Sequence, residues 1–281
     1  MASKSHYVPR VRARRNSARR LSDTLPDALQ RRLADAGGLI AAPLVGVTTD
    51  GYAIPGLFPL RDTGLPLADV SAAAAAFLAA LDGTQRDVAT FPLETDAWRC
   101  WSNVHPFLMR HGQLIESLDD AGREAALNLV RTTLSPSGFE TARNIMRLNE
   151  TIREITGSDE EYGEWLYWMS LMGEPSDDEP WGWQIDGHHL IINAVLLNGQ
   201  LVATPAFMGT EPVTADAGKY EGTTVFREEE SRGYALMTSL SSAQRSLALL
   251  DEELPGEVLT TAFRDNFELR YEGIPYRDLS T

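Results

Sequence analysis

Apolar residues recur with helical spacing in five segments of the chain. In these segments they return every three or four positions, so a helix would carry them on one face. The segments expected to form helices are residues 25–36, 71–81, 122–133, 138–154 and 228–240. Each of these helices can therefore bury one face against a common core.

Shorter runs of β-branched, aromatic and aliphatic residues are typical of strands. Strands are expected over residues 165–172, 183–197 and 200–207, with a tight hairpin turn at Asn198-Gly199 between the last two. Asp50-Gly51 predicts another hairpin, over residues 45–54. Because helices and antiparallel hairpins are segregated along the chain, the predicted fold class is α+β. We expect an antiparallel sheet built from hairpins and packed against several helices.

One short pattern occurs three times, in which an apolar helix end precedes a capping residue and a new helix with an arginine. The three copies are residues 77–89, 114–126 and 236–248. Asp82, Asp119 and Ser241 stand where a side chain can accept hydrogen bonds from the free N–H groups of the next helix. The pattern predicts repeated helix-turn-helix corners, whose arginines we expect to form structural ion pairs.

The charge is unevenly distributed along the chain. The formal net charge of the 281 residues is −15, yet the first 20 residues carry seven basic side chains and no acidic one. No apolar stretch follows Arg20, so this end lacks the pattern of a secretory signal. We therefore expect residues 1–20 to be a disordered basic tail and residues 21–281 to be a single α+β domain in the cytoplasm.

Several classes of function are disfavoured by what the sequence lacks. The acidic balance argues against a nucleic-acid partner, and no apolar run approaches the roughly 18 residues of a membrane span. No glycine-rich phosphate loop is present, so a nucleotide cofactor is not indicated. Cys100 is the single cysteine, which excludes an internal disulfide and a cysteine-rich metal site. We expect its thiol to lie in the core.

Rare residues gather in residues 181–189. Trp181 and Trp183 form one of three tryptophan pairs, and such pairs usually mark a core or the wall of a pocket. Two of the five histidines, His188 and His189, follow directly. Burying polar side chains lowers the stability of the fold unless they have hydrogen-bond partners, so a cluster of them indicates a function. This segment is therefore the predicted functional centre.

The orientation of the two histidines depends on the strand. If residues 183–197 form one continuous strand, His188 and His189 point to opposite faces. Both reach one metal ion only if a bulge at Gly187 breaks the pleat. We therefore expect one histidine to bind the metal and the other ligands to come from helices elsewhere. A structural interpretation, with one histidine satisfied in the core and the other exposed, stays open.

Imidazole with one or two carboxylates is a donor set that suits iron, manganese or similar ions. No HExxH or HxD spacing is present, so the ligands are proposed from residue type alone. The candidate metal ligands are His188, His189, Glu150, Glu229 and Glu230. The candidate catalytic residues are His188, His189 and Arg99, with Arg99 expected to hold an anionic group of the substrate. The candidate substrate-binding residues are Trp181, Trp183, Trp101, Asn103 and Asn193.

These residues also carry a resemblance to a known family. The motifs are Trp181-Gly182-Trp183-x-x-x-Gly187-His188-His189-Leu190-x-x-Asn193, Thr204-Pro205-x-Phe207-x-Gly209-x-x-Pro212, Thr49-Asp50-Gly51 with Pro55-Gly56-Leu57-Phe58, Trp98-Arg99-x-Trp101-x-Asn103, Glu229-Glu230, and the corners. Over roughly residues 30–275 the chain resembles a bacterial family known as domain of unknown function 3500. The resemblance implies a coherent fold and a functional histidine pair, but no settled activity. Members of that family continue past residues 271–275 with another corner and helix, so the resemblance raises the question of whether a partner subunit completes the C-terminal layer.

The first functional hypothesis is a metal-dependent oxidoreductase that acts on a small molecule, with iron or copper favoured as the metal and specialised metabolism as one setting that fits. A metal-dependent hydrolase, for which zinc is a suitable ion, uses the same residue types and stays open. A third alternative is a non-catalytic module for ligand binding or assembly, and a homo-oligomer is compatible with all three.

Overall fold

The computed structural model describes residues 27–103, 111–159, 161–253 and 258–279. The expected basic tail, residues 1–20, lies outside the described residues. The helices are α1 (Asp27–Ala41), α2 (Ala68–Ala79), α3 (Gly83–Ala89), α4 (Asp120–Thr133), α5 (Pro136–Thr156), α6 (Arg227–Ser239) and α7 (Ser242–Ala248), with short 3-10 helices η1 (Asp96–Arg99), η2 (Ile115–Ser117) and η3 (Tyr276–Asp278). None of the helices in the described part of the chain is long and apolar enough to span a membrane.

The strands form one sheet. They are β1 (Thr90–Phe91), β2 (Gln113–Leu114), β3 (Tyr167–Met172), β4 (Trp181–Gly187), β5 (Leu190–Leu197), β6 (Gln200–Val202) and β7 (Ala206–Met208). The order of the strands is β1-β3-β4-β5-β6, with β2 also paired to β3 and β7 also paired to β5. All pairings are antiparallel except that of β1 with β3. The predicted α+β class with a largely antiparallel sheet is therefore confirmed.

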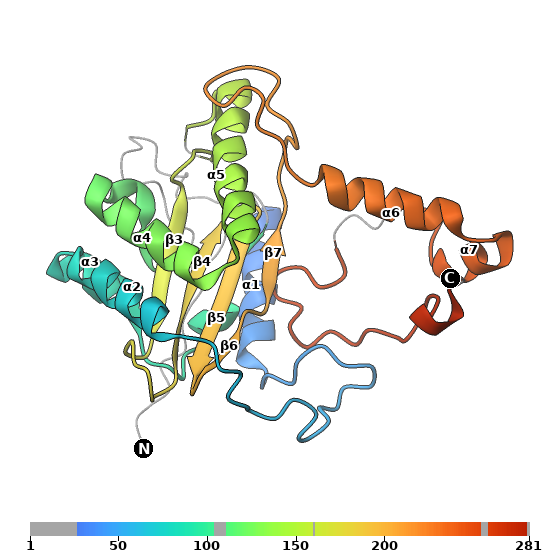
Figure 1. Ribbon diagram of the computed structural model, residues 1–281, viewed down its shortest axis with the longest axis horizontal. Coiled ribbons are helices and arrows are strands. Elements are labelled where there is room, and N and C mark those ends of the chain that lie inside the picture. The colour runs from blue at the N-terminus through green and yellow to red at the C-terminus, as the bar shows by residue number, and fades with distance from the viewer. Residues whose placement is uncertain (1–26, 104–110, 160, 254–257, 280–281) are drawn as a thin grey trace.

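The two faces of the sheet bury different residues. Alternate residues of β4, including Trp181, Trp183 and Ile185, pack in the main core together with side chains of α2, α4 and α5. Figure 1 shows these three helices on the same side of the sheet. On β5, Ile191 belongs to a second cluster that contains Ile40 of α1. Since Ile191 pairs with Asp186, which alternates with Ile185 along β4, this cluster lies on the opposite face. The sheet is thus covered on both sides, and this explains why every residue of β4 is buried.

The capping residues of the three corners act as predicted. Asp82 and Ser241 each accept a hydrogen bond from the third helical N–H and complete a capping box, and Asp119 accepts one from Gly122 N–H. The arginines of the corners fulfil the expectation only in part: Arg123 forms an ion pair with Asp120 at 3.7 Å, and the shorter contacts are with the backbone. Arg86 and Arg123 donate from Nη2 to carbonyl oxygens of the preceding segment, at 2.7 Å in each case. These hydrogen bonds supply donors to carbonyl groups at the point where one helical segment ends.

The expectation of a hairpin over residues 45–54 is wrong. Asp50-Gly51 does form a turn, in which Gly51 N–H donates to Thr48 Oγ1 at 2.8 Å. The backbone partner of Thr48, however, is a C-terminal segment: Leu269 N–H donates to Thr48 O at 2.7 Å, and Thr48 forms a parallel bridge with Glu268. A distant segment has therefore taken the hydrogen bonds that a local hairpin would use.

Two other strand predictions need correction. Asn198-Gly199 forms the expected turn, and both residues have positive φ, 47° and 73°. The strand predicted over residues 200–207 is divided into β6 and β7, and both pair with β5. The strand predicted over residues 183–197 is divided into β4 and β5 by a turn at His188-His189. This second division decides the geometry of the candidate site.

Candidate metal centre

His188 and His189 form the two-residue turn of the β4–β5 hairpin. Gly187 pairs with Leu190, and His189 has a φ of 57°, in the left-handed region. Gly187 is required because a Cβ at this position would lie 2.0 Å from the ring of Tyr167. The hydroxyl of Tyr167 donates to His188 O at 3.2 Å, so a residue of the neighbouring strand β3 also holds the turn. The expectation of one continuous strand is therefore wrong at His188 and His189, which form a turn.

Because they occupy a turn, the two histidines project together and not to opposite faces. Their rings stack with centroids 4.0 Å apart and an angle of 29° between the planes. His188 is buried, with 3% of its surface exposed, and His189 is half-buried. No bulge at Gly187 is needed to bring the two imidazoles side by side.

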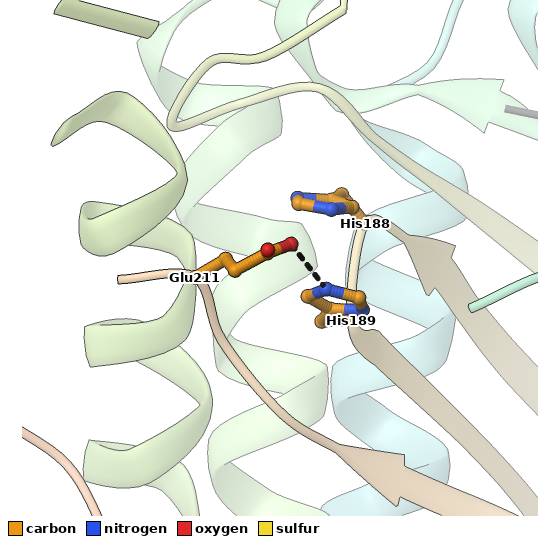
Figure 2. A group of neighbouring side chains, drawn as sticks. All are labelled: His188, His189 and Glu211. Atoms are coloured by element: carbon orange, nitrogen blue, oxygen red, sulfur yellow. Dashed lines mark hydrogen bonds and ion pairs between the residues drawn. The ribbon is translucent and has the colours of Figure 1, made fainter. Parts of the chain in front are cut away.

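Glu211 supplies a carboxylate to this pair. It lies three residues after the end of β7, and Gly209 N–H donates to His189 O at 2.8 Å, which fixes the start of this connection to the turn. Figure 2 shows the carboxylate pointing toward the two imidazoles. One donor atom from each of His188, His189 and Glu211 can be chosen so that all lie within 4.8 Å of one another.

Neighbouring oxygens define which nitrogen of each imidazole carries the proton. His189 Nδ1 lies 2.7 Å from the carbonyl oxygen of Asn103, which can only accept. His188 Nδ1 lies 2.9 Å from Asn149 Oδ1, and Asn149 Nδ2 donates to Gly163 O at 2.8 Å. In both histidines Nδ1 is therefore the donor, and in the neutral ring Nε2 carries the lone pair. A metal-binding histidine usually donates its other ring N–H to such an oxygen.

The contact between His189 and Glu211 is attractive only when a positive charge is present. His189 Nε2 lies 3.3 Å from Glu211 Oε2. When Nδ1 is the donor of a neutral ring, this contact joins two acceptors, which repel. Either a second proton on the ring or a cation between the two atoms converts the contact into an attraction. The arrangement is thus suited to hold a cation.

Joint binding of one ion by both rings needs a small rearrangement. An imidazole binds a metal in the plane of its ring, at about 2.0–2.1 Å for an ion such as zinc. Two planes inclined by 29° with centroids 4.0 Å apart do not meet at that distance from both nitrogens. One ring must therefore turn about its Cβ–Cγ bond when a metal is bound by both.

Aromatic rings border the histidine pair on both sides. The ring of Tyr162 meets His188 edge-on at 5.2 Å, and the ring of Phe207 lies 6.1 Å from His189. Burial raises the pKa of Tyr162 above its usual value, and the carboxylates of Glu161 and Glu211 raise it further. Tyr162 therefore stays a neutral phenol beside the pair at neutral pH.

The other carboxylates proposed as ligands lie outside the group formed by His188, His189 and Glu211. Glu150 accepts a hydrogen bond from Glu164 N–H at 3.0 Å and forms a short ion pair with Arg153. Burial would raise the pKa of Glu150, but these hydrogen bonds outweigh it and the pKa is lowered. Glu229 and Glu230 are exposed in the first turn of α6, where acidic residues favour the helix dipole.

Arg99 is occupied by structural contacts and has no donor left for a substrate. Its five N–H groups make five hydrogen bonds. Three go to the carbonyl oxygens of Leu39, Ile40 and Ala42 at the end of α1, and two go to the carboxylate of Asp265. The proposed role of Arg99 in substrate binding is therefore replaced by one in capping α1 and holding the C-terminal segment.

The residues proposed for substrate binding have structural partners. Trp181 and Trp183 lie in the main core and donate from Nε1 to Ser176 O and Thr133 Oγ1. Trp101 packs in the second cluster, on the α1 side of the sheet. Asn193 is held by Gln184 and Pro205: it accepts from Gln184 Nε2 at 2.6 Å and donates to Pro205 O at 2.9 Å. Asn103 does reach the site, through the carbonyl oxygen that accepts from His189.

Residues 63–281 match the model of a family described as protein of unknown function (DUF3500). The chain belongs to this family. Comparison with the curated proteins gave no match, and neither did comparison with the solved structures. The DUF3500 match contains all three residues of the candidate centre and both asparagines that fix its histidines.

The sequence did not predict Glu211 as a residue of the centre, or Asn149 and Tyr162 as the residues that contact His188. Glu211 lies within the Gly209-x-x-Pro212 part of the DUF3500 motif, and this position was the available signal. Asn149 precedes the proposed ligand Glu150 on α5, so the prediction reached the correct turn of the helix and the wrong side chain. Nothing in the spacing of Tyr162 distinguishes it from a core residue.

Proposed function

We propose that the protein binds a divalent transition-metal ion through His188, His189 and Glu211 and uses it to oxidise a small molecule. The observation that carries this proposal is the meeting of two imidazoles and one carboxylate at a turn whose two Nδ1 atoms are already engaged. Iron and copper are the favoured ions.

The donor set fits this class of ion. Two histidines with one carboxylate form the set that non-haem iron(II) oxygenases use, and it leaves coordination positions open for substrate and oxygen. The metal would supply the one-electron chemistry that protein side chains lack. The chain itself orients the ligands: Asn103 and Asn149 hold the imidazoles, and Tyr162 shields His188.

Metal content is the first test. The protein, purified without a histidine tag, is expected to bind about one equivalent of Fe(II) or Cu(II) in equilibrium titration. His188→Ala, His189→Ala and Glu211→Gln are expected to lower the affinity at least tenfold. Glu229→Gln is the matched control because it removes an exposed carboxylate outside the group. Binding that is unchanged in all three site variants would refute the metal site.

Oxygen consumption tests the reaction. The iron-loaded protein is expected to consume O2 when it is supplied with an accepted member of a panel of small aromatic and aliphatic acids, and Glu211→Gln should abolish this. If the protein instead binds one equivalent of spectroscopically silent zinc, hydrolyses a substrate and consumes no oxygen, the hydrolase is favoured. Thermal shifts with these acids but no turnover would favour a binding module.

A further inference from the structure

The carboxylate of the centre lies on a long connection between β7 and α6. Residues 209–226, here called the strap, carry Glu211 near their start. The side chain of Glu211 is 70% exposed, so core packing does not fix its position. The strap must therefore be placed by contacts that its other residues make.

Glu164 anchors the middle of the strap. Its side chain is only 5% exposed and accepts from Lys219 Nζ at 2.8 Å and, over a short hydrogen bond, from the hydroxyl of Tyr220. Arg143 of α5 donates to its other oxygen at 2.8 Å. A buried carboxylate with three donors strongly opposes the loss of any one of them.

The same short segment also fixes the histidine pair. The carbonyl oxygen of Gly163, next to Glu164, accepts from Asn149 Nδ2, and Asn149 in turn accepts from His188 Nδ1. Residues 163 and 164 thus contact both halves of the centre, the histidine turn through Asn149 and the strap through Lys219. Residues 163 and 164 therefore form one common anchor that fixes the distance between the imidazoles and Glu211.

Further contacts keep the strap folded on α5 if one ionic contact is removed. Lys219 N–H donates to both carboxylate oxygens of Glu154 at 3.3 Å. Ala215 and Val225 pack with Leu148 in a small apolar cluster. A substitution at the Lys219 side chain is therefore expected to shift the strap without unfolding the protein.

We infer that Glu164 is a positioning residue for the metal centre, and that it sets through Lys219 and Tyr220 where the strap holds Glu211. The inference rests on the proposed metal site. Residues that orient a metal ligand typically change the affinity for the metal by 10–100-fold. Because Glu154 and the apolar cluster still hold the strap, loss of the Lys219 contact belongs at the lower end of that range.

Two variants separate positioning from general stabilisation. Lys219→Met and Arg143→Met each remove one cation that lies 2.8 Å from Glu164, but only Lys219 belongs to the strap. Titration with Fe(II) is expected to give about tenfold weaker binding for Lys219→Met and less than threefold for Arg143→Met. Thermal unfolding should show that Arg143→Met is destabilised at least as much as Lys219→Met. If Glu164 has a purely structural role, Lys219→Met and Arg143→Met should bind Fe(II) with equal affinity.

Amide exchange provides a readout that does not depend on metal. Exchange at Gly209, whose N–H donates to His189 O, should accelerate in Lys219→Met and stay near wild type in Arg143→Met. If Lys219→Met fails to fold, Tyr220→Phe removes one hydroxyl from the same anchor and takes its place.

The outcomes distinguish the two proposals. Metal binding that depends on the histidines and Glu211 but is unchanged in the strap variants would overturn the inference and leave the metal site standing. If the wild-type protein binds no metal, the proposed function fails, and amide exchange still decides whether the Glu164 anchor positions the strap at the histidine turn. Equal exchange at Gly209 in both variants would then overturn it.

Discussion

The imidazoles of His188 and His189 stack with their centroids 4.0 Å apart, although the two residues are neighbours in the sequence. Neighbouring residues of a strand point to opposite faces. A two-residue hairpin turn removes this constraint, because the left-handed backbone of His189 returns its side chain to the side of His188. The pair can therefore act as one unit at the end of the β4–β5 hairpin.

The first prediction tests what holds this turn. Gly187→Ala places a methyl group 2.0 Å from the ring of Tyr167, which is itself fully buried. Displacing that ring should lower the free energy of unfolding by about 1–3 kcal/mol. Gly38→Ala is the control, since its Cβ meets nothing within 4 Å in the interior of α1, and it should raise stability by about 0.5–1 kcal/mol. Urea unfolding measures both, and a Gly187→Ala protein as stable as wild type would contradict the account of the turn.

The fold was largely predictable because local patterns and tertiary packing agree over most of the chain. Amphipathic spacing identified α1, α2, α4 and α5, and the capping side chains Asp82, Asp119 and Ser241 marked where helices begin. The position of α6 was also predicted, but none of its residues is buried, so the expectation that it buries one face in the core is wrong. The pattern failed at Asp50-Gly51, where a segment more than 200 residues away supplies the backbone partner. Sequence spacing carries no information about such a partner.

The candidate site was predictable only in part, for a different reason. Both faces of the sheet are covered, so apolar residues run through β4 and β5 without the alternation that would reveal a turn. Gly187-His188-His189-Leu190 also lacks the Asn-Gly signal that identified the next hairpin. Glu211 comes close to the histidines through the pairing of β7 with β5, a contact that spacing alone does not reveal.

A second prediction concerns the oxygen that orients His188. Asn149→Leu removes the acceptor of the Nδ1 proton, so the ring loses its orientation and metal affinity should fall 10–100-fold. Asn149→Asp keeps an acceptor at this position and should lower the metal affinity clearly less than Asn149→Leu does. Both variants lose the donor to Gly163 O, which separates the effect on the ring from the effect on the loop. Equal affinities of the two variants, measured by Fe(II) titration, would show that the acceptor does not orient the ring.

The thiol of Cys100 supplies a third prediction. Burial raises its pKa to about 12, and the nearby carboxylates of Asp96 and Asp186 contribute in the same direction. Since the thiolate is the reactive form, the native protein should not react with a disulfide reagent at about pH 8. In denaturant the single cysteine should react with one equivalent of the reagent. Rapid stoichiometric labelling of the native protein would show that Cys100 is accessible and would make it a candidate nucleophile.

A fourth prediction follows from the charge of Glu164 and gives stability a defined dependence on pH. Burial alone would raise its pKa, but hydrogen bonds from Lys219, Tyr220 and Arg143 outweigh burial and bring the pKa below its usual value near 4.5. A carboxyl group whose pKa is lowered by folding stabilises the native state fully above its unfolded pKa. This contribution is lost as the pH falls below about 4.5 and passes through the lower pKa of the folded state. Urea unfolding of the wild-type protein should therefore show a loss of stability as the pH falls below about 4.5.

Glu164→Gln provides the comparison, because it keeps the shape of the side chain and removes the titrating group. Its stability should be lower than that of wild type at neutral pH, since Lys219 and Arg143 lose a charged partner. Its loss of stability as the pH falls below about 4.5 should be smaller than that of wild type, and the remainder should come from other carboxylates such as Glu150. Parallel pH profiles of the two proteins would mean that Glu164 is not held as a charged group by the strap, and that the ionic anchor of Glu211 is weaker than its geometry indicates.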